Sequence, residues 1–317
     1  MRIGPKLNDH AEFRRFRSGE LAFRAVVFFS AATVPLIMVG ILWELFRNSR
    51  LSLAKFGIGF LTSSVWNPVT EQFGALSGIF GTGVSALVAM ILAVPLGLII
   101  ALFLVELAPP RMSAFFGGAI ELLAAVPSII YGMWGLFVFA PFMADHVQPF
   151  LGDTLGFLPL FKGPPLGIGM LTAGIILALM VLPYISSVTR DVFRMVPIVV
   201  KESAYGVGAT NWEVTRGVTI RYALRGVVGA GFLGLGRALG ETMAVTFVIG
   251  NSHRISASLF ASANSISSTL ANEFTEASDP VYLSSLIELG LVLFLITIIF
   301  QIAAQIWLWS IKKKLAV

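Results

Sequence analysis

The chain of 317 residues contains no cysteine and only three histidines, His10, His146 and His253. The absence of cysteine excludes disulfides, thiolate nucleophiles and cysteine-ligated metals. The histidines lie far apart in the sequence, so we expect no metal site and no cofactor. Charged residues are also scarce, at 12% of the chain, compared with about 25% in an average soluble domain.

Hydrophobic residues make up 56% of the chain, and its mean hydropathy is +0.87. A soluble fold of this size would need more charge to cover its surface, so the composition indicates a membrane-embedded protein. The sequence also lacks any Gly-Lys dipeptide and therefore any P-loop. If the chain takes part in ATP-driven transport, the ATPase must be another polypeptide.

Six apolar stretches reach or nearly reach the roughly 20 residues that a helix needs to cross a bilayer. Five of them, residues 25–43, 72–105, 122–144, 163–189 and 289–311, are free of Asp, Glu, Lys and Arg. The sixth stretch, residues 223–250, is interrupted by Arg225, Arg237 and Glu241. The stretches are continuous and do not alternate, which argues against barrel strands. They predict an all-α polytopic membrane protein with six transmembrane helices.

The first stretch is preceded by an Arg-rich leader and is followed by no small-x-small cleavage site. It therefore predicts a retained helix and not a cleaved signal peptide. We expect a basic cytoplasmic leader at residues 1–24 and a transmembrane domain at residues 25–317, with a cytoplasmic loop at about 190–222.

The distribution of basic residues predicts the orientation. If both chain ends are cytoplasmic, 16 of the 22 Lys and Arg residues lie inside and five lie in outer loops. This asymmetry follows the positive-inside rule. It also accounts for the net charge of +5, so nucleic-acid binding needs no separate hypothesis.

Arg237 and Glu241 are unusual charges for a transmembrane stretch. Arg237 follows Arg225 by 12 residues, or roughly 18 Å along a continuous helix, which is near the middle of the membrane. Such a charge costs at least about 2.5–3.5 kcal/mol on insertion scales. One interpretation is an ion pair that locks helices, with Glu241 one turn later on the same face. The other is a polar path in which the Arg237 guanidinium meets an oxyanion and Glu241 is its counter-ion.

The inner loop at residues 190–222 contains helix-forming segments around a turn of small residues at 206–209. This pattern predicts two short helices at the cytoplasmic face. They would form either an amphipathic surface hairpin or a docking element for another protein.

Within this loop, Glu202, Ser203 and Ala204, followed four residues later by Gly208, resemble the EAA-x-x-x-G coupling motif of ABC importer permeases. In that family the loop fits into a cleft on a cytoplasmic ATPase. Residues 120–135, 234–247 and 270–274 further resemble the phosphate-specific permeases of the PstC type. The resemblance covers the chain from about residue 50 to its end and does not include the leader before residue 20.

The resemblance implies a type I ABC importer permease fold in a bacterial inner membrane. Its partners would be a second, related permease, two cytoplasmic ATPase subunits and an extracytoplasmic phosphate-binding protein. It also implies a role for Arg237 and Glu241 in phosphate passage. One position departs from the family pattern, because Arg221 stands where the extended coupling motif has proline. The exit from the loop is therefore expected to bend differently.

Three alternatives remain at this point. A sulfate or molybdate permease would share the same family features. A self-sufficient secondary transporter or channel would more often show additional spans and an internal repeat. A membrane enzyme acting on lipids would need a nucleophile, base or metal cluster, which the histidine and cysteine content disfavours.

Overall fold

The computed structural model describes residues 9–315 and divides the chain into two compact units, Met1–Asn48 and Ser49–Val317. The first unit contains one helix, α1 (Asp9–Asn48), which joins the end of the predicted leader to the first apolar stretch. Residues 1–8 of the leader lie outside the described residues.

The second unit contains four long helical assemblies, each of which provides or includes one span. They are α4 (Leu76–Leu102) continued by η1 (Phe103–Leu107), α9 (Met170–Arg194), α11 (Asn211–Val214) with η5 (Thr215–Thr219) and α12 (Ile220–Leu239), and α15 (Pro280–Leu315). A fifth, α6 (Ser128–Trp134), η2 (Gly135–Phe139), α7 (Ala140–Phe142), η3 (Met143–Val147) and α8 (Gln148–Leu155), also has the length of a span. The shorter helices are α2 (Arg50–Phe56), α3 (Gly59–Thr62), α5 (Pro110–Ala124), η4 (Pro159–Phe161), α10 (Ile198–Gly206), α13 (Met243–Thr246) and α14 (Ile266–Glu273).

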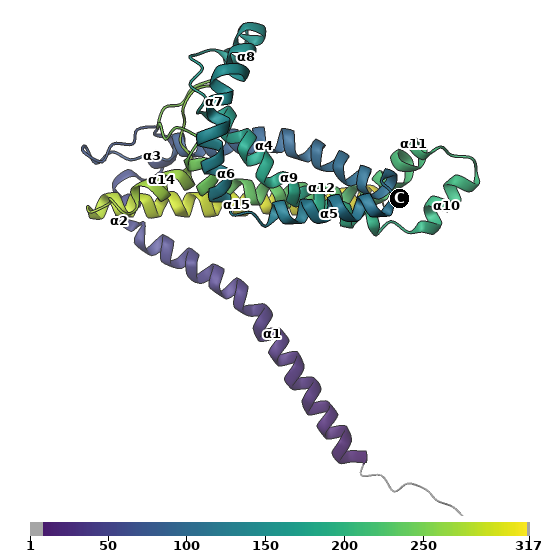
Figure 1. Ribbon diagram of the computed structural model, residues 1–317. Helices are drawn as coiled ribbons and strands as arrows, with labels where there is room; N and C mark the ends of the chain where they lie inside the picture. The colour runs from purple at the N-terminus through teal and green to yellow at the C-terminus, as the bar shows by residue number, and fades with distance from the viewer. Residues whose placement is uncertain (1–8, 316–317) are drawn as a thin grey trace, which may run out of the picture. The chain divides into compact units, whose positions relative to one another are not determined.

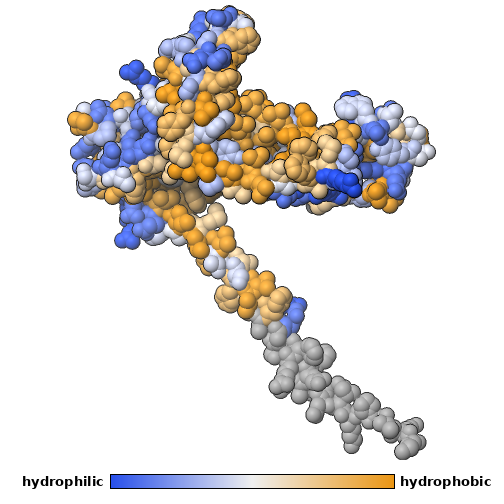
Figure 2. Space-filling view, viewed as in Figure 1, coloured by the Kyte–Doolittle hydropathy of each residue, from blue (hydrophilic) through white to orange (hydrophobic). Residues whose placement is uncertain are grey.

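Six helices in the described residues are long and apolar enough to cross a membrane, which confirms the predicted number. Within the second unit, α4, α9, α12 and α15 run alongside one another, with α10 and α11 at one end and α3 and α14 at the other (Figure 1). Hydrophobic residues cover the middle of this unit, whereas hydrophilic residues gather at its ends (Figure 2). This distribution is the one that a bilayer requires.

The predicted boundaries of the third and fifth spans were wrong. The third apolar stretch begins at residue 122, but α5 ends at Ala124 and a new helix begins at Ser128. Pro127 explains the break, because proline disfavours the helical conformation of the preceding residue. The fifth helix ends at Leu239 instead of continuing to residue 250, and its assembly begins earlier, at Asn211.

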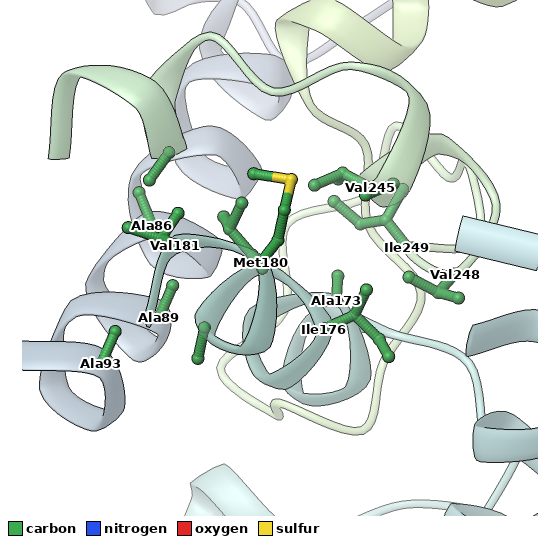
Figure 3. Packing of buried hydrophobic residues seen from close by; sticks show 14 of the residues in the cluster. Ala86, Ala89, Ala93, Ala173, Ile176, Met180, Val181, Val245, Val248 and Ile249 are labelled. Atoms are coloured by element: carbon green, nitrogen blue, oxygen red, sulfur yellow. The ribbon is translucent and has the colours of Figure 1, made fainter. Parts of the chain in front are cut away.

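Helix α9 lies at the centre of the second unit. In its most apolar window 61% of the residues are buried, compared with 28% or less in each of the other candidate spans. Small residues of α4, including Ala86, Ala89 and Ala93, face larger residues of α9 such as Met180 in the main core (Figure 3). Since alanine has little bulk, the two helix backbones can approach closely.

Close packing also explains part of the glycine content of α12. A Cβ atom added at Gly234 would lie 2.6 Å from the side chain of Ile185 on α9. By contrast, nothing lies within 4 Å of the corresponding position at Gly229. The glycines of this helix therefore serve close approach at some positions and not at others. Gly234 therefore allows the helix end that carries Arg237 to approach α9 closely.

Candidate translocation site and coupling loop

Arg237 lies in the last turn of α12, which is a continuous helix from Ile220. It is therefore roughly 18 Å further along the helix axis than Arg225, at 1.5 Å per residue. Its side chain belongs to an exposed residue of this chain. Lipid tails offer no hydrogen-bond acceptors, so an arginine within a membrane domain needs another protein surface, a polar path or an anion as its partner.

The guanidinium group of Arg237 stacks on an aromatic ring and pairs with no carboxylate among the described residues. Its central carbon lies 5.6 Å from the centroid of the Tyr184 ring on α9. The ring quadrupole attracts the cation without using its N–H donors. Those donors remain available for an oxyanion. Tyr184 was not predicted from the sequence, although a tyrosine directly after Pro183 within an apolar run is a usable signal.

Glu241 does not lie on the same helix face as Arg237, and this part of the prediction was wrong. Because α12 ends at Leu239, Glu241 falls in the break before α13. Its carboxylate accepts a hydrogen bond from the backbone N–H of Ala244, at 3.3 Å. No ion pair within 4.0 Å joins Arg237 to Glu241 in the described part of the chain. Glycine at position 240 favours this break, because glycine is a poor helix former.

The separation of the two charges leads to a prediction for Glu241. Glu241→Gln keeps an oxygen that can accept from Ala244 and leaves the Arg237 stack untouched. We expect the variant to reach the membrane at the wild-type level, because no buried ion pair is broken. Quantitative immunoblotting of membranes tests this expectation. A level reduced several-fold, restored by the double change Arg237→Glu with Glu241→Arg, would instead support an ion pair that locks the helices.

The predicted pair of short helices around a turn is found only in part, because α10 is short but α11 is the first turn of the fifth span, Asn211–Leu239. Helix α10 ends at Gly206, and a capping box between Thr210 and Glu213 begins α11. This reciprocal capping satisfies backbone donors that would otherwise lack partners. Residues 190–194 belong to α9, and the fifth span begins at Asn211, so the segment between the spans is shorter than the predicted loop.

The motif residues lie on the surface of this segment. Glu202, Ser203 and Gly208 are exposed, and Ala204 is partly buried. Gly208 has a φ of +89°, a conformation that favours glycine. Arg221, which replaces the proline of the family motif, continues the helix from η5 into α12 without a break. The exit from the loop is therefore helical.

Large apolar side chains of the coupling loop are exposed. Val207 is 87% exposed and Trp212 is 65% exposed. They accompany Val199 and Tyr205 of α10, which are also exposed. Exposed apolar groups gathered near a polar end of a membrane protein indicate an interaction surface. Figure 1 places this surface at the end of the second unit that carries α10 and α11.

At the opposite end of the second unit, Glu273 is the centre of a polar cluster. Its carboxylate accepts hydrogen bonds from the indole of Trp66 at 2.5 Å and from the hydroxyl of Tyr282 at 2.7 Å. The ring of His253 lies 3.2 Å away. Burial raises the pKa of Glu273, but the hydrogen bonds from His253, Tyr282 and Trp66 outweigh it and hold the pKa below its usual value.

This cluster predicts a loss of stability in acid. A carboxyl with a lowered pKa stabilises the folded state above its unfolded pKa, about 4.5, and this stabilisation is lost as the pH falls through the folded value. Thermal unfolding in detergent at pH 6 and at progressively lower pH measures the loss. Glu273→Gln should lower the midpoint at pH 6 and show a smaller fall in acid. If the unfolding midpoints of the wild type and of Glu273→Gln fell equally with pH, Glu273 would not contribute to the loss of stability in acid.

The comparisons with known proteins agree with this architecture. The family described as "Binding-protein-dependent transport system inner membrane component" matches residues 93–308. A solved structure of the MetNI methionine ABC transporter, in an inward-facing conformation, matches with a TM-score of 0.51. This match covers 75% of this chain and 94% of that one at 17% identity. At this identity the match shows the fold alone, which is that of an ABC importer permease.

Curated relatives extend over almost the whole chain. A phosphate transport system permease protein PstC from Mesorhizobium japonicum is 53% identical over 96% of this chain and 94% of its own length. A protein of the same description from Pasteurella multocida is 50% identical over 93% of each chain. The chain therefore belongs to the binding-protein-dependent inner membrane components and, within them, to the family of the PstC phosphate transport permeases.

Proposed function

We propose that this chain is the permease subunit of an ATP-driven importer for inorganic phosphate and forms half of its translocation path. The observation that carries this proposal is the placement of Arg237. Arg237 is an exposed residue in the last turn of α12, and its guanidinium lies over the Tyr184 ring with no carboxylate within 4.0 Å among the described residues. A planar guanidinium binds a tetrahedral oxyanion through two parallel hydrogen bonds. The relatives are described as phosphate transport permeases.

The exposed residues of the membrane domain and the family description indicate which partner proteins the chain would bind. The exposed face of Arg237 would be completed by a second, related permease. The exposed motif of Glu202, Ser203, Ala204 and Gly208 would dock with one of two ATPase subunits. The family description implies a binding protein, and an extracytoplasmic phosphate-binding protein would deliver the anion. The distribution of basic residues supports cytoplasmic chain ends in a bacterial inner membrane.

Reconstitution tests the function directly. The tagged chain is co-expressed with the proposed second permease and ATPase from the same organism, purified and placed in liposomes. ATP hydrolysis is measured with the binding protein and with phosphate, sulfate or molybdate as the anion. We expect stimulation and uptake with phosphate alone. Stimulation by sulfate or molybdate, with phosphate inactive, would assign the importer to another oxyanion.

A further inference from the structure

Helix α10 has few attachments to the rest of the protein. None of its residues is fully buried. Lys201 is nevertheless bonded outside the loop, to a residue 95 positions earlier in the sequence. Among the described residues, the other side-chain hydrogen bond of α10, from Ser203 to Val199, is internal to the helix. The position of α10 therefore depends strongly on Lys201.

Lys201 meets two other elements at one carboxylate oxygen. Its Nζ lies 2.6 Å from Oε1 of Glu106, which belongs to η1 at the end of the second span. The hydroxyl of Thr219, in η5 of the fifth span, donates to the same oxygen at 3.0 Å. The side chains of Lys201 and Glu106 are only 16% and 10% exposed, and Thr219 is fully buried. We call these three residues the junction.

The junction lies beside a small apolar core. Ala101, Phe193 and Ala223 are buried there and come from the second, fourth and fifth spans. Val105 and Ile220, the neighbours of Glu106 and Thr219 in the sequence, pack against them. The inner ends of these spans are therefore packed together, and α10 is tied to them through Lys201.

We propose that the junction is the mechanical link by which α10 moves the second and fifth spans, so that Glu106, Lys201 and Thr219 are positioning residues for transport. This inference rests on the proposed function. A largely buried ion pair adds little net stability compared with apolar side chains, but it specifies geometry. The fifth span carries Arg237 at its other end. A movement of α10 that is transmitted through Thr219 and along a continuous helix would reach the translocation site.

The test uses Lys201→Met, which keeps the length of the side chain and removes its charge. Lys162→Met, at an exposed position outside α10, is the matched control. The importer containing each variant is purified, and phosphate transported per ATP hydrolysed is measured. We expect this ratio to fall about tenfold in Lys201→Met, with normal ATPase association. A normal ratio would overturn the proposal. A loss of ATPase association that matches the loss of uptake would also overturn the proposal, because Lys201 would then act only in binding the ATPase.

A covalent link provides a second test that does not depend on the substitution alone. Val105 and Ile198 line one pocket beside Lys201, and the natural chain has no cysteine. Cysteines at both positions, joined by a short bifunctional reagent in the Lys201→Met background, should restore the ratio towards that of the control. Cross-linking without any recovery would overturn the proposal. If Lys201→Met prevents membrane insertion, the same measurements on Thr219→Val, with Thr154→Val as its exposed control, decide the outcome.

Failure of this inference can be separated from failure of the proposed function. If the wild-type importer does not transport phosphate, the proposed function fails. If it does, and Gly208→Leu impairs uptake while Lys201→Met and Thr219→Val leave the ratio unchanged, the coupling loop acts without the junction and this inference alone fails.

Discussion

Arg237→Gln is expected to lower phosphate uptake by about 100-fold or more, because charge-assisted hydrogen bonds contribute about 1.5–3 kcal/mol each and a guanidinium can form two. The change removes the cation that lies over the Tyr184 ring at the end of the fifth span. It should not reduce membrane insertion, since it removes a charge that is costly there. Radiolabelled phosphate uptake, in cells that lack their own importer, is measured at equal amounts of membrane-inserted protein.

Two further variants sharpen this prediction. Arg237→Lys keeps the charge but loses the planar fork, so we expect uptake between those of the wild type and the glutamine variant. Arg111→Gln, at an exposed position in the first turn of α5, is the matched control and should transport normally. Normal uptake by Arg237→Gln would contradict a role in the path. Arg237 would then have a purely structural function in its stack on Tyr184.

Gly208→Leu is expected to lower phosphate uptake by about tenfold or more, because the substitution strains the backbone of the turn. Gly208 has a φ of +89°, and a residue with a side chain held in such a conformation is strained by about 1–3 kcal/mol. A Cβ atom at this position would meet nothing within 4 Å in this chain, so no internal clash contributes. The turn between α10 and α11 should change shape, and the docking surface should be distorted. Pull-down of the ATPase with the tagged permease, together with uptake, measures the effect.

Asparagine separates the effect of the backbone from that of size. Gly208→Asn introduces a side chain with the same number of heavy atoms and the same branching as leucine, but asparagine tolerates positive φ better than leucine. It should therefore retain more ATPase binding than Gly208→Leu. Gly206→Ala is the control, because Gly206 has no positive φ and open space around it. Equal losses of ATPase binding in the two Gly208 variants would indicate that the added side chain obstructs the ATPase surface, and that backbone strain is not the cause. Normal binding and uptake in both would contradict the coupling role of the loop.

The apolar runs in the sequence predict the number of transmembrane helices better than they predict the residues at which each helix begins and ends. The number of spans was predictable, since each run of about 20 apolar residues must bury itself in lipid whatever its neighbours do. The ends were less predictable, because Pro127 and Gly240 interrupt helices within stretches that remain apolar. Both residues are visible in the sequence, so local breaking signals should take precedence over the absence of charge when a boundary is placed.

In the candidate site too, some features could be predicted from the sequence and others required the folded structure. Arg237 could be recognised from the sequence as a charge near mid-membrane, and Gly208 as part of a motif. The value of φ at Gly208 required the folded turn. The bond between Glu106 and Lys201 joins residues 95 positions apart, and no pattern of local spacing indicates such a contact.

The sequence by itself determined that this protein is a six-span permease of the ABC importer class, because hydrophobicity and a contiguous motif are properties of short segments. Only the tertiary structure decided what Arg237 contacts. Its partner, Tyr184, is brought to it by the packing of α9 against α12. The expected partner, Glu241, is four residues away but lies beyond the helix end, where its carboxylate accepts a hydrogen bond from the backbone N–H of Ala244 in α13. Contacts depend on where helices end and on which faces meet, and these are settled by packing of the whole chain.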